Sequence, residues 1–185
     1  QKVNLSLSML KFIFAIFFYT LLAHQAFCQN YEVKRLGLED GLSNNFVVGI
    51  TQDRQGYLWY ATESGLNRFD GKKFTVYKRR QDNKGISGNN LNKIFSDRKD
   101  DYVYVATQRD GLNRVNSLTG EVAHYKNDPS NPESIITNDI TDITAARNGG
   151  LWISTFYRGV EYFDKQKQTF SHYNKKTYPG LGSDL

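Results

Sequence analysis

Cysteine is nearly absent from the sequence: Cys28 is the single one among 185 residues. One thiol excludes a disulfide framework and a zinc site built on cysteines. Proline is also scarce, with 3 residues, and the 15 glycines form no low-complexity run, which excludes collagen-like and disordered chains. The net charge of +5 is small and scattered, so we expect no nucleic-acid partner. Aromatic residues, by contrast, make up 14% of the chain and favour β-structure.

The first 28 residues, 1–28, have the composition of a secretory signal peptide. An uncharged stretch, residues 12–23, follows Lys11, and residues 26–28 (Ala-Phe-Cys) then offer small residues at their first and third positions. The stretch is twelve residues long, whereas a membrane-spanning helix needs roughly 20. We therefore expect export, translation starting at Met9 and cleavage near Cys28. A retained membrane anchor is the alternative, and a bulky residue before the cysteine disfavours a lipoprotein.

Three copies of one unit fill the rest of the chain, each with four short β-type runs. The second run reads LWYAT, VYVAT or LWIST, and the third reads GLNRF, GLNRV or GVEYF. The tyrosines that end the fourth runs are 48 residues apart both times: Tyr77, Tyr125 and Tyr173. A four-run unit that repeats at about this length is typical of a β-propeller blade.

The predicted fold class is therefore all-β: three four-stranded antiparallel blades and a stub, in an incomplete propeller. Propellers close with about four to eight blades. We therefore expect the sequence to be the N-terminal piece of a longer protein, whose remaining blades are its partners. The expected limits are residues 29–40 for a lone strand (31–36) that completes a missing last blade, 41–84, 85–132 and 133–180 for the three blades, and 181–185 for the start of a fourth.

Four positions recur in the units, and the ten residues that fill them are expected to be structural. Glycine at the turn between the second and third runs supplies a positive φ. Aspartate after the third run caps the next turn. Tryptophan in the second run packs one blade on the next, and a sugar-stacking platform is its alternative role. The ten are Trp59, Gly65, Asp70, Tyr77, Gly111, Tyr125, Trp152, Gly159, Asp164 and Tyr173.

Residues 41–77, GLSNNFVVGITQDRQGYLWYATESGLNRFDGKKFTVY, resemble the repeat of the two-component regulator propellers. The segment NDPSNPESI, residues 127–135, is also typical of that family. The second unit departs from the pattern, with Tyr104 in place of tryptophan. The resemblance implies a hybrid sensor histidine kinase of Bacteroidetes, anchored in the inner membrane with its propellers on the periplasmic face. It also implies a homodimer that responds to glycan breakdown products.

No set of side chains suggests catalysis or a cofactor. His124 and His172 occupy equivalent places in the fourth runs of two units. These places lie on the outer rims of neighbouring blades, too far apart to share a metal ion. We therefore expect no metal, no cofactor and no enzymatic activity in this segment.

Ligand binding is expected at the loops between the second and third runs, because these loops differ most between units. In a propeller they lie on one face, around the central funnel. Arginine and tyrosine there would bond to and stack on an anionic or carbohydrate ligand, while an ordinary surface loop is the alternative. The candidates are Glu63, Ser64, Arg109, Asp110, Tyr157 and Arg158.

The sequence thus favours a ligand-sensing segment of a two-component regulator. Two alternatives stay open: a secreted propeller scaffold that binds carbohydrate or protein, and a polysaccharide lyase or glycosidase propeller. An enzyme of the latter kind needs convergent carboxylates, or a His/Tyr/Arg set, in the funnel. The sequence indicates neither arrangement.

Overall fold

The computed structural model describes residues 6–23 and 33–181. The chain divides into two units, residues 1–35 and 36–185. The first unit holds one helix, α1 (Leu7–Ala23), which contains the apolar stretch noted in the sequence. Within the described residues, no helix is both long enough and apolar enough to cross a membrane. The cleavage site predicted at residues 26–28 lies outside the described residues.

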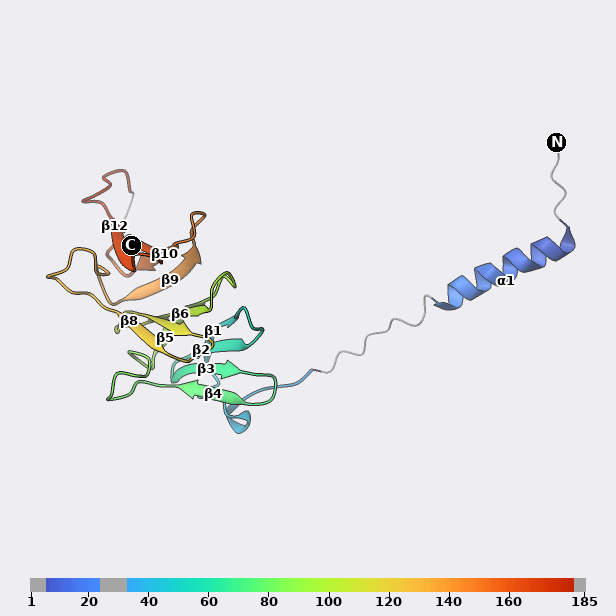
Figure 1. Cartoon of the computed structure of the whole chain (residues 1–185), viewed down its shortest axis with the longest axis horizontal. Helices are drawn as coiled ribbons and strands as arrows, with labels where there is room; N and C mark the ends of the chain where they lie inside the picture. The colour runs from blue at the N-terminus through green and yellow to red at the C-terminus, as the bar shows by residue number, and fades with distance from the viewer. Residues whose placement is uncertain (1–5, 24–32, 182–185) are drawn as a thin grey trace. The chain divides into compact units, whose positions relative to one another are not determined.

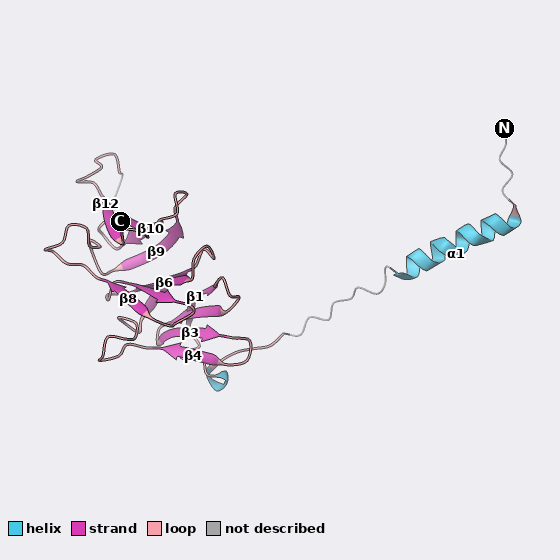
Figure 2. Ribbon diagram, in the orientation of Figure 1, coloured by secondary structure: helices cyan, strands magenta, loops and turns pink. Residues whose placement is uncertain are grey.

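The strands of the second unit form three four-stranded antiparallel sheets (Figures 1 and 2). Each sheet is a meander, in which strands that follow one another in the sequence are hydrogen bonded to one another. The predicted blades are confirmed, and we call them blades 1, 2 and 3 in chain order. Their strands are β1 (Val47–Gln52), β2 (Leu58–Thr62), β3 (Gly65–Phe69) and β4 (Phe74–Tyr77) in blade 1, β5 (Leu91–Phe95), β6 (Tyr102–Thr107), β7 (Leu112–Asn116) and β8 (Val122–Tyr125) in blade 2, and β9 (Ile140–Ala145), β10 (Leu151–Thr155), β11 (Val160–Asp164) and β12 (Thr169–Tyr173) in blade 3.

The turn between the second and third strands of each blade requires the predicted glycine. Gly111 has a φ of +84°, which L side chains rarely adopt, and a Cβ atom there would collide with the carbonyl oxygen of Tyr125. The recurring glycine and the recurring tyrosine therefore mark one close approach of two backbone segments. The same approach joins Gly65 to Tyr77 and Gly159 to Tyr173.

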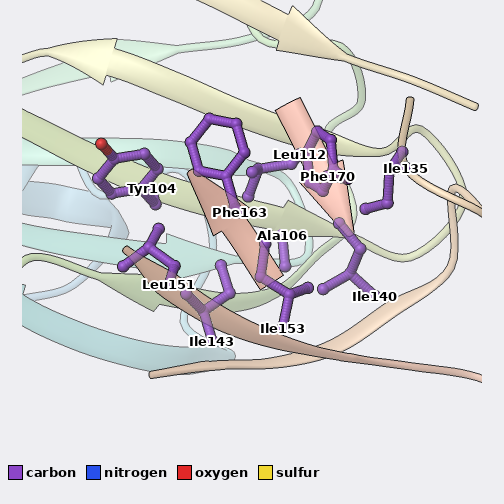
Figure 3. Packing of buried hydrophobic residues seen from close by; sticks show 10 residues of the cluster. All are labelled: Tyr104, Ala106, Leu112, Ile135, Ile140, Ile143, Leu151, Ile153, Phe163 and Phe170. Atoms are coloured by element: carbon purple, nitrogen blue, oxygen red, sulfur yellow. The ribbon is translucent and has the colours of Figure 1, made fainter. Parts of the chain in front are cut away.

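Two apolar cores form where the blades face one another. Successive residues of a strand point to opposite faces of its sheet. Val103 and Val105 of β6 accordingly pack in a core with Trp59 of blade 1. Tyr104, between them, lies in the second core with Phe163 of blade 3 (Figure 3). Blade 2 is therefore covered on both faces.

The first strands of the blades are neighbours, with β1 beside β5 and β5 beside β9. An ion pair of 2.7 Å between Lys93 Nζ and Asp142 Oδ1 joins β5 to β9. In a meander, the turn between the second and third strands and the connection to the next blade share one end of the sheet. The loops predicted to bind a ligand therefore lie at the same end of all three blades.

The lone strand predicted over residues 31–36 is not formed in its described part. Residues 33–37 have no regular secondary structure, and residues 31 and 32 lie outside the described residues. A 3-10 turn follows at η2 (Leu38–Asp40). A strand is held by hydrogen bonds to a neighbouring strand, so this one would form only against the blade that it completes. Its closing role stays a prediction, as does the start of a fourth blade at 181–185, where residues 182–185 are outside the described part.

Candidate ligand-binding face

The aspartates after the third strands cap turns, as predicted. Asp70 Oδ1 accepts the backbone N–H groups of Lys72 at 2.8 Å and Lys73 at 2.9 Å. These two bonds hold the pKa of Asp70 below its usual value, and the bond from Lys73 has the larger effect. Asp164 Oδ1 accepts two backbone bonds in the same way in blade 3. Both carboxylates therefore serve turns at the end of the blades opposite the ligand loops.

A threonine that recurs in all three units anchors the loops between the second and third strands. Its hydroxyl donates to the carbonyl oxygen of the turn glycine at 2.8 Å in each blade. This role was not predicted from the sequence, although the repeated AT, AT and ST pairs were a visible signal. The backbone at the start and the end of each loop is consequently held in place by this hydrogen bond. The threonines are Thr62, Thr107 and Thr155, all of them buried.

A second overlooked position is the third residue of the glycine-led run. In blade 1, Asn67 Oδ1 accepts the backbone N–H of Ser43 at 2.8 Å. In blade 2, Asn113 accepts that of Ser87 at the same distance. Each asparagine thereby fastens the segment that enters its blade. The repeated serine and asparagine were both visible in the sequence, but their pairing was not, since 24 or 26 residues separate them.

The two equivalent histidines have separate partners. His124 Nε2 lies 2.7 Å from the carbonyl oxygen of Gly85. His172 Nδ1 lies 2.6 Å from Glu161 Oε2, and Glu161 occupies the asparagine position in blade 3. Burial raises the pKa of the Glu161 carboxyl, and His172 offsets this only in part. Among residues 6–23 and 33–181, no group of three or more His, Cys, Asp and Glu side chains could hold a metal ion.

The two tryptophans occupy equivalent strand positions in different surroundings. Trp59 is fully buried between blades 1 and 2, and its Nε1–H donates to Asp53 Oδ2 at 2.7 Å. Trp59 thus packs in one core with Val103 and Val105 of blade 2. Trp152 is half-buried, and its ring lies 5.3 Å from that of Tyr162 and 5.1 Å from that of Tyr173, both in its own blade. Its role against a neighbouring blade stays a prediction.

The six candidate ligand residues all lie on the loops at one end of the blades, but the structure does not gather them into one site. Ser64 Oγ accepts a hydrogen bond of 3.0 Å from Asn44 Nδ2. The Asp110 backbone N–H donates to the Thr107 hydroxyl at 2.8 Å, inside its own turn. Glu63 and Arg158 are exposed on separate blades. Their roles in binding stay predictions.

Arg109, one of the six candidates, lines a groove shared by two blades. The groove has a volume of about 370 Å³ and lies where the β6–β7 loop meets β9 and the β10–β11 loop. Asn92 ties its two sides together, because its Nδ2 donates to the Ile140 carbonyl oxygen at 2.9 Å. The groove is lined by Asn92, Gln108, Arg109, Asp139, Ile140, Thr141 and Phe156.

Tyr157 stands beside this groove in a constrained conformation. Its φ is +61°, which is uncommon for an aromatic residue. Its ring meets the Phe156 ring edge to face, with centroids 4.1 Å apart, and 57% of Tyr157 is exposed. Backbone conformations of this kind cluster at functional loops.

Comparison with known proteins first identifies the repeat. Residues 41–64 and 134–157 match the model of the family described as the two component regulator propeller. These segments contain the first two strands of blades 1 and 3. The curated histidine kinase P4 of Formosa agariphila is 38% identical over 68 residues, which is 36% of this chain and 5% of that relative.

Solved structures share the arrangement of the blades. The extracellular domain of a protein of B. thetaiotaomicron, assigned as a hybrid two component system, matches with a TM-score of 0.79 and 48% identity over 84% of this chain and 22% of its own. PorZ, a surface component of the type-IX secretion system of Porphyromonas gingivalis, matches with a TM-score of 0.58 and 20% identity over 84% and 22% of the two chains. The PorZ likeness shows the fold alone. Residues 41–64 and 134–157 of this chain therefore match the repeat of the two-component regulator propeller family.

Proposed function

We propose that this chain is the extracytoplasmic sensor segment of a hybrid two-component regulator. The observation that carries the proposal is the 48% identity, over 84% of the chain, with the extracellular domain from B. thetaiotaomicron. The similarity to a curated histidine kinase supports the same assignment. Because the chain spans 22% of the first relative and 5% of the second, the other blades, the membrane anchor and the kinase are part of the proposal.

Export is the second element of the proposal. Residues 1–28 would be a signal peptide cleaved near Cys28, and the blades would lie at the periplasmic face of the inner membrane. The apolar helix α1, which carries Lys11 near its start and has no acidic residue in its first turn, supports this assignment.

The proposed stimulus is a small glycan fragment, and the segment itself is not an enzyme. The groove between blades 2 and 3 supports a binding role, because polar side chains and an exposed aromatic ring line it together. Binding would transmit a signal by favouring one packing of domains, or of two subunits in a homodimer, over another.

Kinase activity of the complete gene product tests the proposal. The protein is placed in membrane vesicles, glycan fragments are added on the exported side, and autophosphorylation from ATP is measured. We expect one class of glycan to change the rate by about fivefold or more, within the usual range of coupling between sites. A variant lacking residues 36–181 serves as the control, which should keep ATP-dependent phosphorylation and lose the glycan response. A gene that ends without a kinase would overturn the proposal in favour of a secreted scaffold.

A further inference from the structure

We propose that the groove between blades 2 and 3 is a subsite for one neutral sugar ring, contacted by Arg109, Asp139 and Phe156. The inference rests on the proposed sensor function and names the place and chemistry of ligand recognition.

The groove holds two opposite charges that do not pair. Arg109 and Asp139 line it from different blades. Within residues 33–181, neither side chain forms a hydrogen bond or an ion pair. Elsewhere along the same junction opposite charges do meet, as in the 2.7 Å pair of Lys93 with Asp142. The groove thus offers a ligand one charged hydrogen-bond donor, the Arg109 guanidinium, and one charged acceptor, the Asp139 carboxylate.

The neutral side chains of the groove add one donor group and one acceptor. Gln108 Oε1 accepts a bond of 2.6 Å from Asn90, and its own amide N–H groups have no partner among the described residues. Asn92 uses its Nδ2 on a backbone carbonyl, and its Oδ1 is unpaired in the same part of the chain. Each sugar hydroxyl both donates and accepts, so a ring of hydroxyls matches this mixture of donors and acceptors.

Phe156 supplies an apolar surface at the edge of the groove. Its side chain is a large hydrophobic one, yet 56% of the residue is exposed. Its backbone N–H donates to the carbonyl oxygen of Asp139 at 3.0 Å, and the Tyr157 ring packs against its own. The ring is therefore held in position rather than free. A sugar ring has an apolar C–H face that would cover such a ring while its hydroxyls reach the polar groups.

Blade 2 has different side chains at the positions equivalent to Phe156 and Asp139. The difference explains why the unpaired carboxylate lies in blade 3. Phe156 and Asp139 stand where blade 2 has Gln108 and Asn90, since both pairs are joined by the same backbone bond of 3.0 Å. Gln108 and Asn90 also bond to each other through their side chains at 2.6 Å. Phenylalanine cannot make that bond, so the Asp139 carboxylate is left unpaired beside an aromatic ring.

The balance of charge selects the class of sugar. One guanidinium and one carboxylate give the groove no net charge, so an acidic sugar would gain from Arg109 and lose near Asp139. A neutral ring avoids that repulsion. The volume of about 370 Å³ lies near the lower end of the range of roughly 300–1,000 Å³ for small-molecule sites, which suits a short saccharide.

Binding to a defined panel tests the inference. The protein is used as its gene encodes it, including everything beyond residue 185. The probes are cellotriose, maltotriose, mannotriose, xylotriose and galactotriose, with digalacturonic acid as the acidic arm. We expect one neutral saccharide to bind and Arg109→Ala, Asp139→Ala and Phe156→Ala each to weaken that binding about tenfold or more. Arg147→Ala and Leu118→Ala, at the opposite end of the blades, are matched controls that should bind as the wild type does.

Melting temperatures of the variants show whether each one folds. Should any variant fail to fold, hydrogen exchange on the wild type replaces it: the bound saccharide should protect residues 139–141 and 156. Binding of digalacturonic acid alone would overturn the ligand class. Binding that the three variants leave unchanged, or no binding to any probe, would overturn the site. A glycan-dependent kinase response would still support the sensor function in either case.

Discussion

Lys165 Nζ lies 2.8 Å from Asp97 Oδ2 and 3.0 Å from Asp100 Oδ2, so one cation of blade 3 bridges two carboxylates of blade 2. The contact is largely removed from water, because the side chains of Lys165 and Asp97 keep 14% and 8% of their exposure. At the first junction, Ser117 holds the place of Lys165, and its hydroxyl donates to Gln55 Oε1 at 2.9 Å. In blades 2 and 3, the residue just after the third strand thus contacts the preceding blade.

Replacing Lys165 by methionine should destabilise the junction of blades 2 and 3. The change leaves two neighbouring carboxylates without their cation. Removing one partner of a buried pair costs about 3–5 kcal/mol, and the partial exposure of Asp100 reduces our expectation to about 2–3 kcal/mol. Urea denaturation at pH 7 measures the free energy of unfolding. The exposed Lys126→Met variant is the matched control, with an expected change within about 0.5 kcal/mol.

The effect of Lys165→Met should depend on pH. Burial raises the pKa of Asp97, but the Lys165 ammonium and a backbone bond from Lys99 outweigh it and leave that pKa below its usual value. A carboxyl whose pKa is lower in the folded state stabilises the fold above its unfolded pKa, about 3.9, and loses that contribution as pH falls through the folded pKa. The difference between wild type and variant should therefore shrink below about pH 4. A difference that stays constant from pH 7 to pH 3 would count against the ion pair.

Gly111→Ala should be far more costly than the same change at Gly71. Both glycines have positive φ, +84° and +93°, so both variants carry the backbone strain of about 1–2 kcal/mol. Only at Gly111 would the new Cβ also collide with a neighbouring backbone carbonyl, that of Tyr125, while nothing lies within 4 Å at Gly71. We expect a loss of about 3 kcal/mol or more for Gly111→Ala in urea denaturation. Equal losses at the two sites would show that strain alone makes the glycine necessary.

The sequence indicated the blades because the residues that mark the turns and the strand ends recur within each unit. Gly111 and Tyr125 recur at fixed spacing, and one backbone approach requires both. The roles of Thr107 and Asn113 were also present in the repeats, but their partners are set by how the turn and the entering segment fold back. A repeat therefore reveals that a position matters before it reveals what the position contacts.

The candidate site was only partly predictable for a related reason. Arg109 and Phe156 both lie on loops singled out by their variation. Asp139 and Asn92 lie on other segments and reach the groove only because the blades pack side by side. Which charges are left unpaired there depends on that packing, whereas Arg158, equally prominent in the sequence, is simply exposed.

Glu161→Gln should change how stability depends on pH. Glu161 is fully buried, and burial raises its pKa despite the nearby His172. A carboxyl with a raised folded-state pKa makes the fold less stable as pH rises from its unfolded pKa through its folded one. The variant should therefore gain stability over the wild type at pH 8 and show a smaller change between pH 5 and pH 8. Urea midpoints at the two pH values measure this, with exposed Glu121→Gln as the control. An identical pH dependence in wild type and variant would contradict the raised pKa.

The outer face of blade 3 has the surface that the other blades use for packing. On blade 2, the Tyr125 ring lies 4.9 Å from Phe163 and 5.9 Å from Phe170 of the next blade. Tyr173 holds the same position in blade 3, and its ring stacks on Tyr178 of its own segment at 4.9 Å. The face therefore has the composition of a blade interface and is expected to bind a further blade.

A chain that ends at Leu185 should consequently associate with itself through this face. We expect its weight-average mass in sedimentation equilibrium to rise with concentration, since exposed apolar surface of this kind promotes association. Trp152→Ser should weaken the association about tenfold, because it removes the largest ring of the face. Tyr157→Ser, which removes an exposed aromatic ring on the loops, should leave it unchanged. Adding a further blade after residue 185 should abolish it, because that blade would occupy the face. A monodisperse monomer that melts cooperatively would show instead that three blades are stable with this face bare.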